Sequence, residues 1–92
     1  MTVAAIFEAT MSRGQVEQLA ELMREALPTR PEGVVTAALL VEDEAIQLIA
    51  FWRDRETFDA YLATVDVPRG VELMRKAGVE PEWRVVDVME LG

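Results

Sequence analysis

Apolar and polar residues alternate in four stretches of the chain, and apolar residues repeat at helical spacing between those stretches. This pattern predicts the element order β-α-β-β-α-β. Residues 2–10 alternate as a first strand. Ser12 and Gln15 have the spacing of a capping box. Apolar side chains then recur at helical spacing over residues 16–27, so a first helix is expected to run up to Pro28.

The second half of the chain is predicted to contain two strands, an interrupted helix and a last strand, over residues 34–42, 45–53, 54–78 and 82–91. Asp43 and Glu44 make a connection short enough for a hairpin. Asp54 can cap the helix, Pro68 interrupts it because proline is not tolerated inside a helix, and Gly78 ends it. The chain is therefore expected to form a single α+β domain over residues 1–92.

The two middle strands carry apolar residues on both faces. In an antiparallel sheet with one face in water, apolar and polar residues would alternate. Right-handed crossovers place both helical segments on one side of the sheet, so the helices cover only one of its faces. We therefore expect a four-stranded antiparallel sheet with helices on one face and a second copy of the chain on the other, in a homodimer.

The composition narrows the possible partners. The chain has a formal net charge of -8, and its only lysine is Lys76, so it is expected to repel phosphate backbones and anionic lipid surfaces. It has no cysteine or histidine, which disfavours a disulfide, a structural zinc site and nucleophilic catalysis. Its glycines form no phosphate-binding motif. We expect a cytoplasmic, bacterial protein with no metal, no cofactor, no nucleic acid and no membrane as partner.

The segment Ile49-Ala50-Phe51-Trp52-Arg53-Asp54-Arg55-Glu56-Thr57-Phe58-Asp59-Ala60-Tyr61-Leu62 resembles the strand-to-helix junction of the antibiotic biosynthesis monooxygenase domain. That domain is a member of the dimeric α/β-barrel superfamily. The resemblance covers nearly the whole chain and implies ferredoxin-like protomers that pair sheet to sheet into a barrel. It also implies a cavity between each sheet and its helices. The family includes cofactor-independent oxygenases that act on quinols and polyketide phenols, haem-degrading enzymes, and proteins without established activity.

The haem-degrading branch of this family is disfavoured. It uses an asparagine on the first strand, a tryptophan at the end of the third strand and a histidine after the helical break. Only Trp52 matches, because Phe7 or Glu8 lies where the asparagine would be and Glu72 lies near the histidine position. The chain contains neither asparagine nor histidine.

Aromatic residues are the first candidates for a ligand site. Trp52 offers a large apolar face and one N–H donor to a planar ligand, or it packs in the core. Tyr61 shares the inward stripe of the second helix with Phe58, and its hydroxyl can hold a phenolic oxygen or extend into water. Phe7, which lies at or next to the position of the family's asparagine on the first strand, is a further candidate for ligand contact.

Charged residues on or beside apolar strands are the second group of candidates: Arg53, Arg84, Glu8 and Asp87. A buried charge is costly unless it is paired, so structural ion pairs are one interpretation. The other is a pocket in which Arg53 or Arg84 is the electrostatic partner of an anionic or enolic substrate and Asp87 or Glu8 is the base. The candidate catalytic residues are Arg53, Tyr61 and Asp87, and the candidate ligand-binding residues are Trp52, Phe7, Glu8, Phe58 and Arg84.

Two functions remain open at this point. The first is a cofactor-independent monooxygenase that holds a small phenol or quinol in an apolar pocket and aids its deprotonation. The second is a non-catalytic homodimer that binds a small apolar ligand or serves as a scaffold. The absence of histidine, cysteine and asparagine favours the second, because acid and base chemistry would fall on carboxylates and tyrosine.

Overall fold

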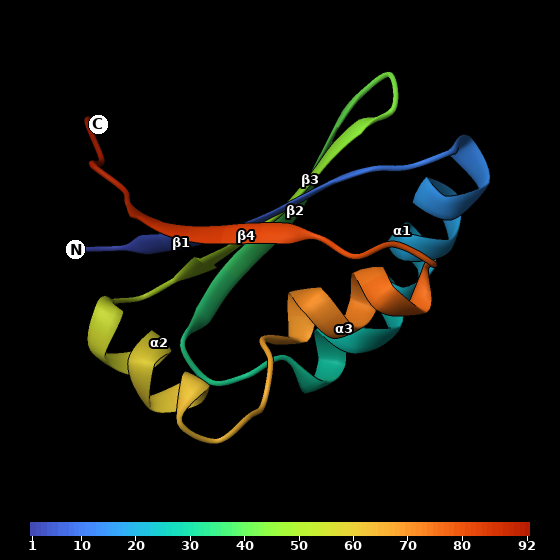
Figure 1. Ribbon diagram of the computed structural model, residues 1–92. Coiled ribbons are helices and arrows are strands. Elements are labelled where there is room, and N and C mark those ends of the chain that lie inside the picture. The colour runs from blue at the N-terminus through green and yellow to red at the C-terminus, as the bar shows by residue number, and fades with distance from the viewer.

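The computed structural model describes all 92 residues. Its elements are β1 (Val3–Thr10), α1 (Arg13–Ala26), a 3₁₀ turn η1 (Leu27–Thr29), β2 (Val34–Glu42), β3 (Ala45–Trp52), α2 (Arg55–Leu62), α3 (Arg69–Lys76) and β4 (Glu82–Asp87). The strands form one antiparallel sheet in the order β2-β3-β1-β4. All helices lie on one side of this sheet (Figure 1). The predicted ferredoxin-like α+β fold, with its helices on one face, is therefore confirmed.

Local sequence explains where the helices begin and end. The Ser12 hydroxyl accepts the backbone N–H of Gln15, and the Gln15 side chain accepts the backbone N–H of Ser12, so both halves of the predicted capping box form. The side chain of Asp54 accepts the N–H of Thr57 at 2.7 Å and begins α2. Pro68 lies directly before α3, and Gly78 follows it at a φ of +93° that favours glycine.

Several predicted boundaries are wrong by one or more residues, and two of them have a clear cause. The α-helix that was expected to reach Pro28 ends at Ala26, because Pro28 lies in a separate 3₁₀ turn. The last strand, expected over residues 82–91, ends at Asp87. Asp87 pairs with Val3, the first residue of β1, so the neighbouring strand has no further residues to pair with β4. Beyond it, the N–H of Val88 donates to the carbonyl of Thr2, and the hydroxyl of Thr2 donates to the carboxylate of Glu90.

The register of the sheet separates its side chains into two sets. Phe7 pairs with Leu48 and Trp83, and all three point toward the helices. The hydrophobic core lies on this side, between the sheet and the three helices. Its buried members are Val3, Ala5, Phe7, Met11, Leu19, Ile46, Leu48, Trp52, Phe58, Val71, Met74 and Ala77. None of the helices has the length and apolar content needed to cross a membrane.

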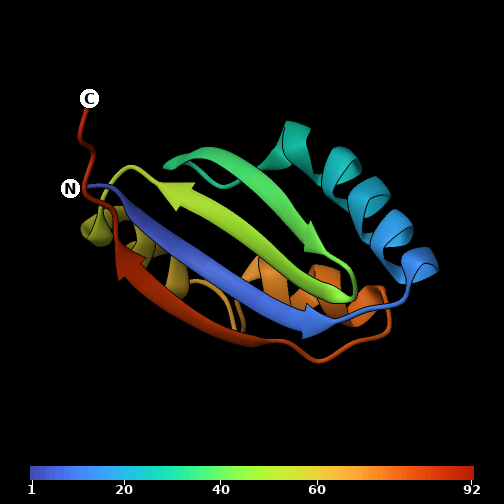
Figure 2. The same cartoon turned by 90° about the horizontal axis from the view of Figure 1, so that it is seen from above.

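The other side of the sheet, which we call the open face, is covered by no element of the chain (Figures 1 and 2). It is apolar along its middle: Ala4, Ile6, Ala38, Leu40, Ile49, Phe51 and Val86 all point outward. Leu40 is 48% exposed, and Ile6, Ile49 and Phe51 are half-buried. The prediction that the middle strands are apolar on both faces is therefore correct, and the second apolar face meets solvent in the isolated chain.

Candidate functional site

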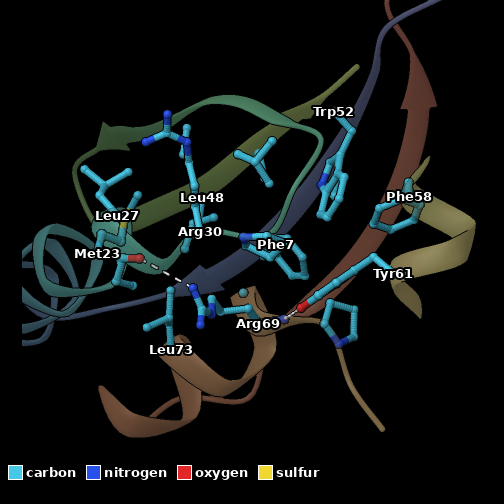
Figure 3. A pocket seen from close by; sticks show the side chains of 18 residues that line it. Phe7, Met23, Leu27, Arg30, Leu48, Trp52, Phe58, Tyr61, Arg69 and Leu73 are labelled. Carbon is cyan, nitrogen blue, oxygen red and sulfur yellow. Dashed lines mark hydrogen bonds between the residues drawn. The ribbon is translucent and has the colours of Figure 1, made fainter. Parts of the chain in front are cut away.

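A cavity of about 80 Å³ lies between the sheet and the helices (Figure 3). It is lined by 18 residues, of which 13 are hydrophobic: Ala5, Phe7, Met23, Ala26, Leu27, Arg30, Pro31, Val34, Ala37, Leu48, Ala50, Trp52, Phe58, Tyr61, Pro68, Arg69, Gly70 and Leu73. Leu27, at 44% exposure, and Arg30 are exposed members of this set, so the cavity reaches solvent beside the loop that follows α1. We call this opening the mouth.

A row of small side chains leaves space in the middle of the sheet. Ala5 of β1 pairs with Ala50 of β3, and Ala50 pairs with Ala37 of β2, so three alanines lie side by side across three strands. All three line the cavity. Helix–sheet packing normally fills such space with larger side chains, since protein interiors are close-packed. The cavity therefore exists because this row has almost no side-chain volume.

Three aromatic residues form one wall of the cavity. Trp52 ends β3, and the cap at Asp54 turns the chain into α2, which returns Phe58 and Tyr61 to the indole one turn apart. The ring centroids of Trp52 and Phe58 are 5.2 Å apart in an edge-to-face arrangement, and those of Trp52 and Tyr61 are 4.9 Å apart. Such geometry favours another aromatic ring beside them. The expected positions of Trp52, Phe58 and Tyr61 beside one cavity are thus what the structure shows.

The backbone approaches the aromatic wall closely at Gly33. Its φ is +99°, and a Cβ atom there would lie 2.3 Å from Cγ2 of Thr57 and 3.2 Å from the indole of Trp52. The carbonyl of Gly33 also accepts the N–H of Arg53 at 2.8 Å. Only glycine fits this position. The hydrogen bond from Arg53 to Gly33 connects the loop before β2 to the residues that precede α2.

A second close approach forms the opposite side of the cavity. Gly70, in the first turn of α3, lies against Phe7 so closely that a Cβ atom there would be 2.6 Å from the ring. On its other side the Phe7 ring stacks with Trp83, with centroids 5.9 Å apart. Phe7 is 2% exposed and is held in place from both directions.

The hydroxyl group of Tyr61 lies at the start of α3. It accepts a hydrogen bond from the backbone N–H of Arg69 at 2.8 Å. This N–H lies at the start of α3, where the N-cap residue Pro68 has no side-chain acceptor for it. Because the hydroxyl oxygen accepts this bond, its own hydrogen remains available to donate. No acceptor within the chain takes it. Tyr61 therefore brings a fixed O–H donor to the cavity (Figure 3).

The charged residues that line the cavity are arginines only, Arg30 and Arg69. Nη1 of Arg69 donates to the carbonyl oxygens of Thr29, at 2.7 Å, and of Ala26, at 3.4 Å. No aspartate or glutamate lines the cavity, so no carboxylate base is present in it.

The charged strand residues that the sequence nominated lie outside the cavity. Glu8 and Arg84 pair with each other on the open face, and the hydrogen bond from Arg84 holds the pKa of Glu8 below its ordinary value. Arg53 points outward, donating to Oγ1 of Thr57 at 3.0 Å. Asp87 lies at the end of β4, 3.8 Å from Nη2 of Arg55. The structure thus shows these groups in surface ion pairs and hydrogen bonds.

The sequence analysis did not single out the cationic residues that do border the cavity. Arg30 lies in a loop and Arg69 in the first turn of α3, on segments that become neighbours only in the fold. No periodicity marks either of them. One signal was available: Pro31 beside Arg30, and Pro68 beside Arg69, fix the backbone at both positions. The chain has no cluster of three or more acidic residues placed to hold a metal ion.

Comparison of the sequence with models of protein families and with curated proteins finds no match. Solved structures do match the fold. SnoaB, a cofactor-independent oxygenase from Streptomyces nogalater, has a TM-score of 0.65 at 23% identity, over 98% of this chain and 95% of its own. A Bordetella bronchiseptica protein provisionally named an antibiotic biosynthesis monooxygenase has a TM-score of 0.68 at 13% identity, over 97% and 98%. Rv0793 from Mycobacterium tuberculosis has a TM-score of 0.64 at 18% identity, over 99% and 98%.

These structures extend over nearly the whole chain and share its arrangement of sheet and helices. At such low sequence identity the likeness concerns the fold and not the activity. The resemblance noted at the strand-to-helix junction of residues 49–62 is therefore confirmed for the fold. The chain has the fold of the antibiotic biosynthesis monooxygenase-like domains.

Proposed function

We propose that the chain is a cofactor-independent monooxygenase that acts on a small phenol or quinol held in the cavity between sheet and helices. The observation that carries this proposal is the lining of the cavity, which is apolar and aromatic with positive charge as its only charge. Apolar walls alone would raise the pKa of a phenol, but the arginines of the lining and the Tyr61 donor act in the opposite direction, because each stabilises negative charge on the phenol oxygen. Such a site favours the phenolate, the form that reacts with dioxygen.

The reaction uses the electrons of the substrate. The phenol loses its O–H proton to water at the mouth, and the phenolate transfers an electron to dioxygen. The superoxide then joins a ring carbon that carried hydrogen, and the resulting peroxide anion takes a proton back from water to give a hydroperoxide. Loss of water from the hydroperoxide converts that carbon to a carbonyl group. One oxygen atom of dioxygen enters the product and the other leaves as water, so a phenol and dioxygen yield a quinone and water without another reductant.

Within this scheme Tyr61 and Trp52 have separate roles. The hydroxyl of Tyr61 donates its free hydrogen to the substrate oxygen and stabilises the charge that develops there. The indole of Trp52 stacks on the ring and fixes its orientation beside the alanine row. The cavity volume of about 80 Å³ is smaller than the roughly 150 Å³ that an apolar site needs to enclose benzene. The substrate is therefore a single-ring compound that extends partly into the mouth.

Dioxygen consumption tests this proposal. With a single-ring phenol or quinol in air, we expect uptake of one dioxygen per substrate, and ¹⁸O₂ should place one labelled atom in the product. Tyr61→Phe should lower the rate about tenfold, since it removes one neutral hydrogen-bond donor and keeps the ring. Glu25→Gln, on the exposed side of α1, is the matched control and should retain the full rate. No uptake above the buffer rate with any such substrate would contradict the proposal.

A second function is favoured by one observation: the cavity has no carboxylate base. A chain that binds a small aromatic ligand without transforming it needs only the apolar walls and the Tyr61 donor. Titration calorimetry in the absence of dioxygen distinguishes the two. Binding of the phenol together with uptake in air supports the monooxygenase, whereas binding without uptake supports the non-catalytic ligand-binding protein.

We also propose that the functional unit is a homodimer formed through the open face. The support is the apolar middle of that face, where Ile49 pairs laterally with Ile6 and Ala38 and no helix covers them. Two such sheets pack face to face at about 10 Å and bury both apolar surfaces. On this face the charges of Glu8 and Arg84 compensate each other as an ion pair.

Sedimentation velocity tests the dimer. The wild-type protein should sediment at twice the chain mass of 10.3 kDa. Ile49→Arg places an unpaired charge in the middle of the interface and should give the monomer mass. Glu25→Arg also introduces an arginine, on α1 and away from the open face, and this variant should stay dimeric. A wild-type monomer at about 100 μM, well above the usual dissociation constants of stable homodimers, would rule the interface out.

A further inference from the structure

The arginines of this chain fall into two groups. Those away from the cavity each lie within ion-pair distance of a carboxylate: Arg13, Arg24, Arg53, Arg55, Arg75 and Arg84. Arg30 and Arg69 have no such partner, although acidic residues outnumber basic ones by 17 to 9. These two are also the arginines that line the cavity. The two arginines that lack a carboxylate partner thus both lie at the cavity.

The side chain of Arg69 is held in place, but only part of its hydrogen-bonding capacity is used. Both of its side-chain hydrogen bonds use Nη1, which donates to the carbonyls of Ala26 and Thr29 at the end of α1 and in η1. Its Nε and Nη2 groups donate to no atom of the chain. The residue is half-buried, and Figure 3 shows its side chain crossing the cavity edge between Leu73 and Tyr61. A guanidinium with fixed geometry and free N–H groups is suited to bind a carboxylate.

Arg30 contributes charge in a different way. It is exposed at the mouth, and its side chain makes neither a hydrogen bond nor an ion pair within the chain. In Figure 3 the guanidinium groups of Arg30 and Arg69 point in different directions, so they do not form one rigid clamp. Arg30 is therefore a flexible cation at the entrance, and Arg69 is the fixed one at the cavity edge.

We propose that the ligand of this cavity is an aromatic carboxylate whose ring lies among Trp52, Phe58 and Tyr61 and whose carboxylate is bound by Arg69, with Arg30 as a second cation. This inference rests on the proposed function and names the class of its substrate as phenolic acids. The small cavity favours the same arrangement, because a single ring placed inside must extend its substituent toward the mouth. With a neutral ligand, the Nε and Nη2 groups of the half-buried Arg69 would remain without an acceptor from the chain or a compensating charge.

Isothermal titration calorimetry with 4-hydroxybenzoate and its neutral isostere 4-hydroxybenzamide tests the inference. At low salt we expect the wild-type protein to bind the carboxylate about tenfold more tightly than the amide, as charge-assisted hydrogen bonds allow. Added salt should reduce that preference, because screening affects only the charged ligand. Arg30→Gln should weaken carboxylate binding about threefold, the effect of an exposed charge, and leave amide binding unchanged.

Three further variants complete the design. Arg69→Gln should remove most of the preference, and Arg69→Lys, which keeps the charge, should retain part of it. Arg24→Gln removes an arginine of α1 that is paired with Glu21, and it should change nothing. If Arg69→Gln does not fold, Arg30→Gln still decides the matter, because the Arg30 side chain makes no contact that the fold needs.

The outcomes are distinguishable. A preference for the carboxylate that is lost in the Arg30 and Arg69 variants supports the inference. Equal affinity for both ligands, or a preference that both glutamine variants retain, overturns it and leaves the proposed function standing. If neither ligand binds the wild-type protein, the cavity is not an aromatic site, and both proposals fail together.

Discussion

Replacing Phe58 with alanine lowers the free energy of unfolding by about 3–5 kcal/mol, the range measured when large buried aromatic residues are truncated. Phe58 is 1% exposed and packs edge to face on Trp52 at a centroid distance of 5.2 Å. Its removal joins a new void to a cavity that already exists, so neighbouring side chains have little to collapse onto. Urea denaturation followed by circular dichroism measures the change, at one protein concentration for all variants.

Phe58→Leu is the matched control for this substitution. It keeps most of the buried volume and loses the aromatic edge-to-face contact, so the expected loss is about 1–1.5 kcal/mol. If the alanine and leucine variants were equally stable, Phe58 would contribute through its ring chemistry and not through filling space. A loss below about 1 kcal/mol for alanine would show that the core closes around the site.

Replacing Gly33 with alanine lowers the free energy of unfolding by about 2–6 kcal/mol, because backbone strain and steric overlap each cost about 1–3 kcal/mol. The φ of +99° is strained for any residue with a side chain, and the new Cβ would lie 2.3 Å from Cγ2 of Thr57. Thermal unfolding should show a lower midpoint. Ligand binding at the neighbouring Trp52 should weaken as well, because the new Cβ would also lie 3.2 Å from the indole ring.

A double-mutant cycle separates the two causes of that loss. Thr57→Ala removes the methyl group that the new Cβ would touch, so Gly33→Ala should be less damaging in that background by the steric part alone. Gly14→Ala is the neutral control, because no atom lies within 4 Å of its Cβ position and the residue is in a helix. It should be harmless or slightly stabilising. An equally destabilising Gly14→Ala would mean that the loss at Gly33 is not specific to its site.

The order of elements could be predicted because each one has a local cause. The capping residues Ser12 and Asp54 and the interruption at Pro68 act within a few residues, so the sequence is enough to place them. The end of β4 could not be placed, because it depends on where β1 begins, and β1 is distant in sequence. The cavity itself was expected from the family resemblance, and its volume depends on the alanine row that only the register reveals.

The aromatic candidates line the cavity and the charged candidates lie outside it, and strand geometry explains the difference. Successive residues of a strand point to opposite faces, so Phe7 and Glu8 cannot share a cavity, and Arg53, which follows the inward Trp52, points away from it. Arg30 and Arg69 lie outside the strands, where no period of two applies. Their proximity to the cavity depends on the tertiary fold, which brings Arg69 to Thr29 over 40 positions in sequence.

The alanine row has a consequence for how such a protein diversifies. Ala5, Ala37 and Ala50 set the depth of the cavity from within the sheet, while the intervening residues of the same strands form the open face. Replacing one alanine of the row with a larger residue therefore reduces the cavity volume without altering the open face. Cavity size and the composition of the open face can thus evolve, or be engineered, independently on alternate residues of three strands.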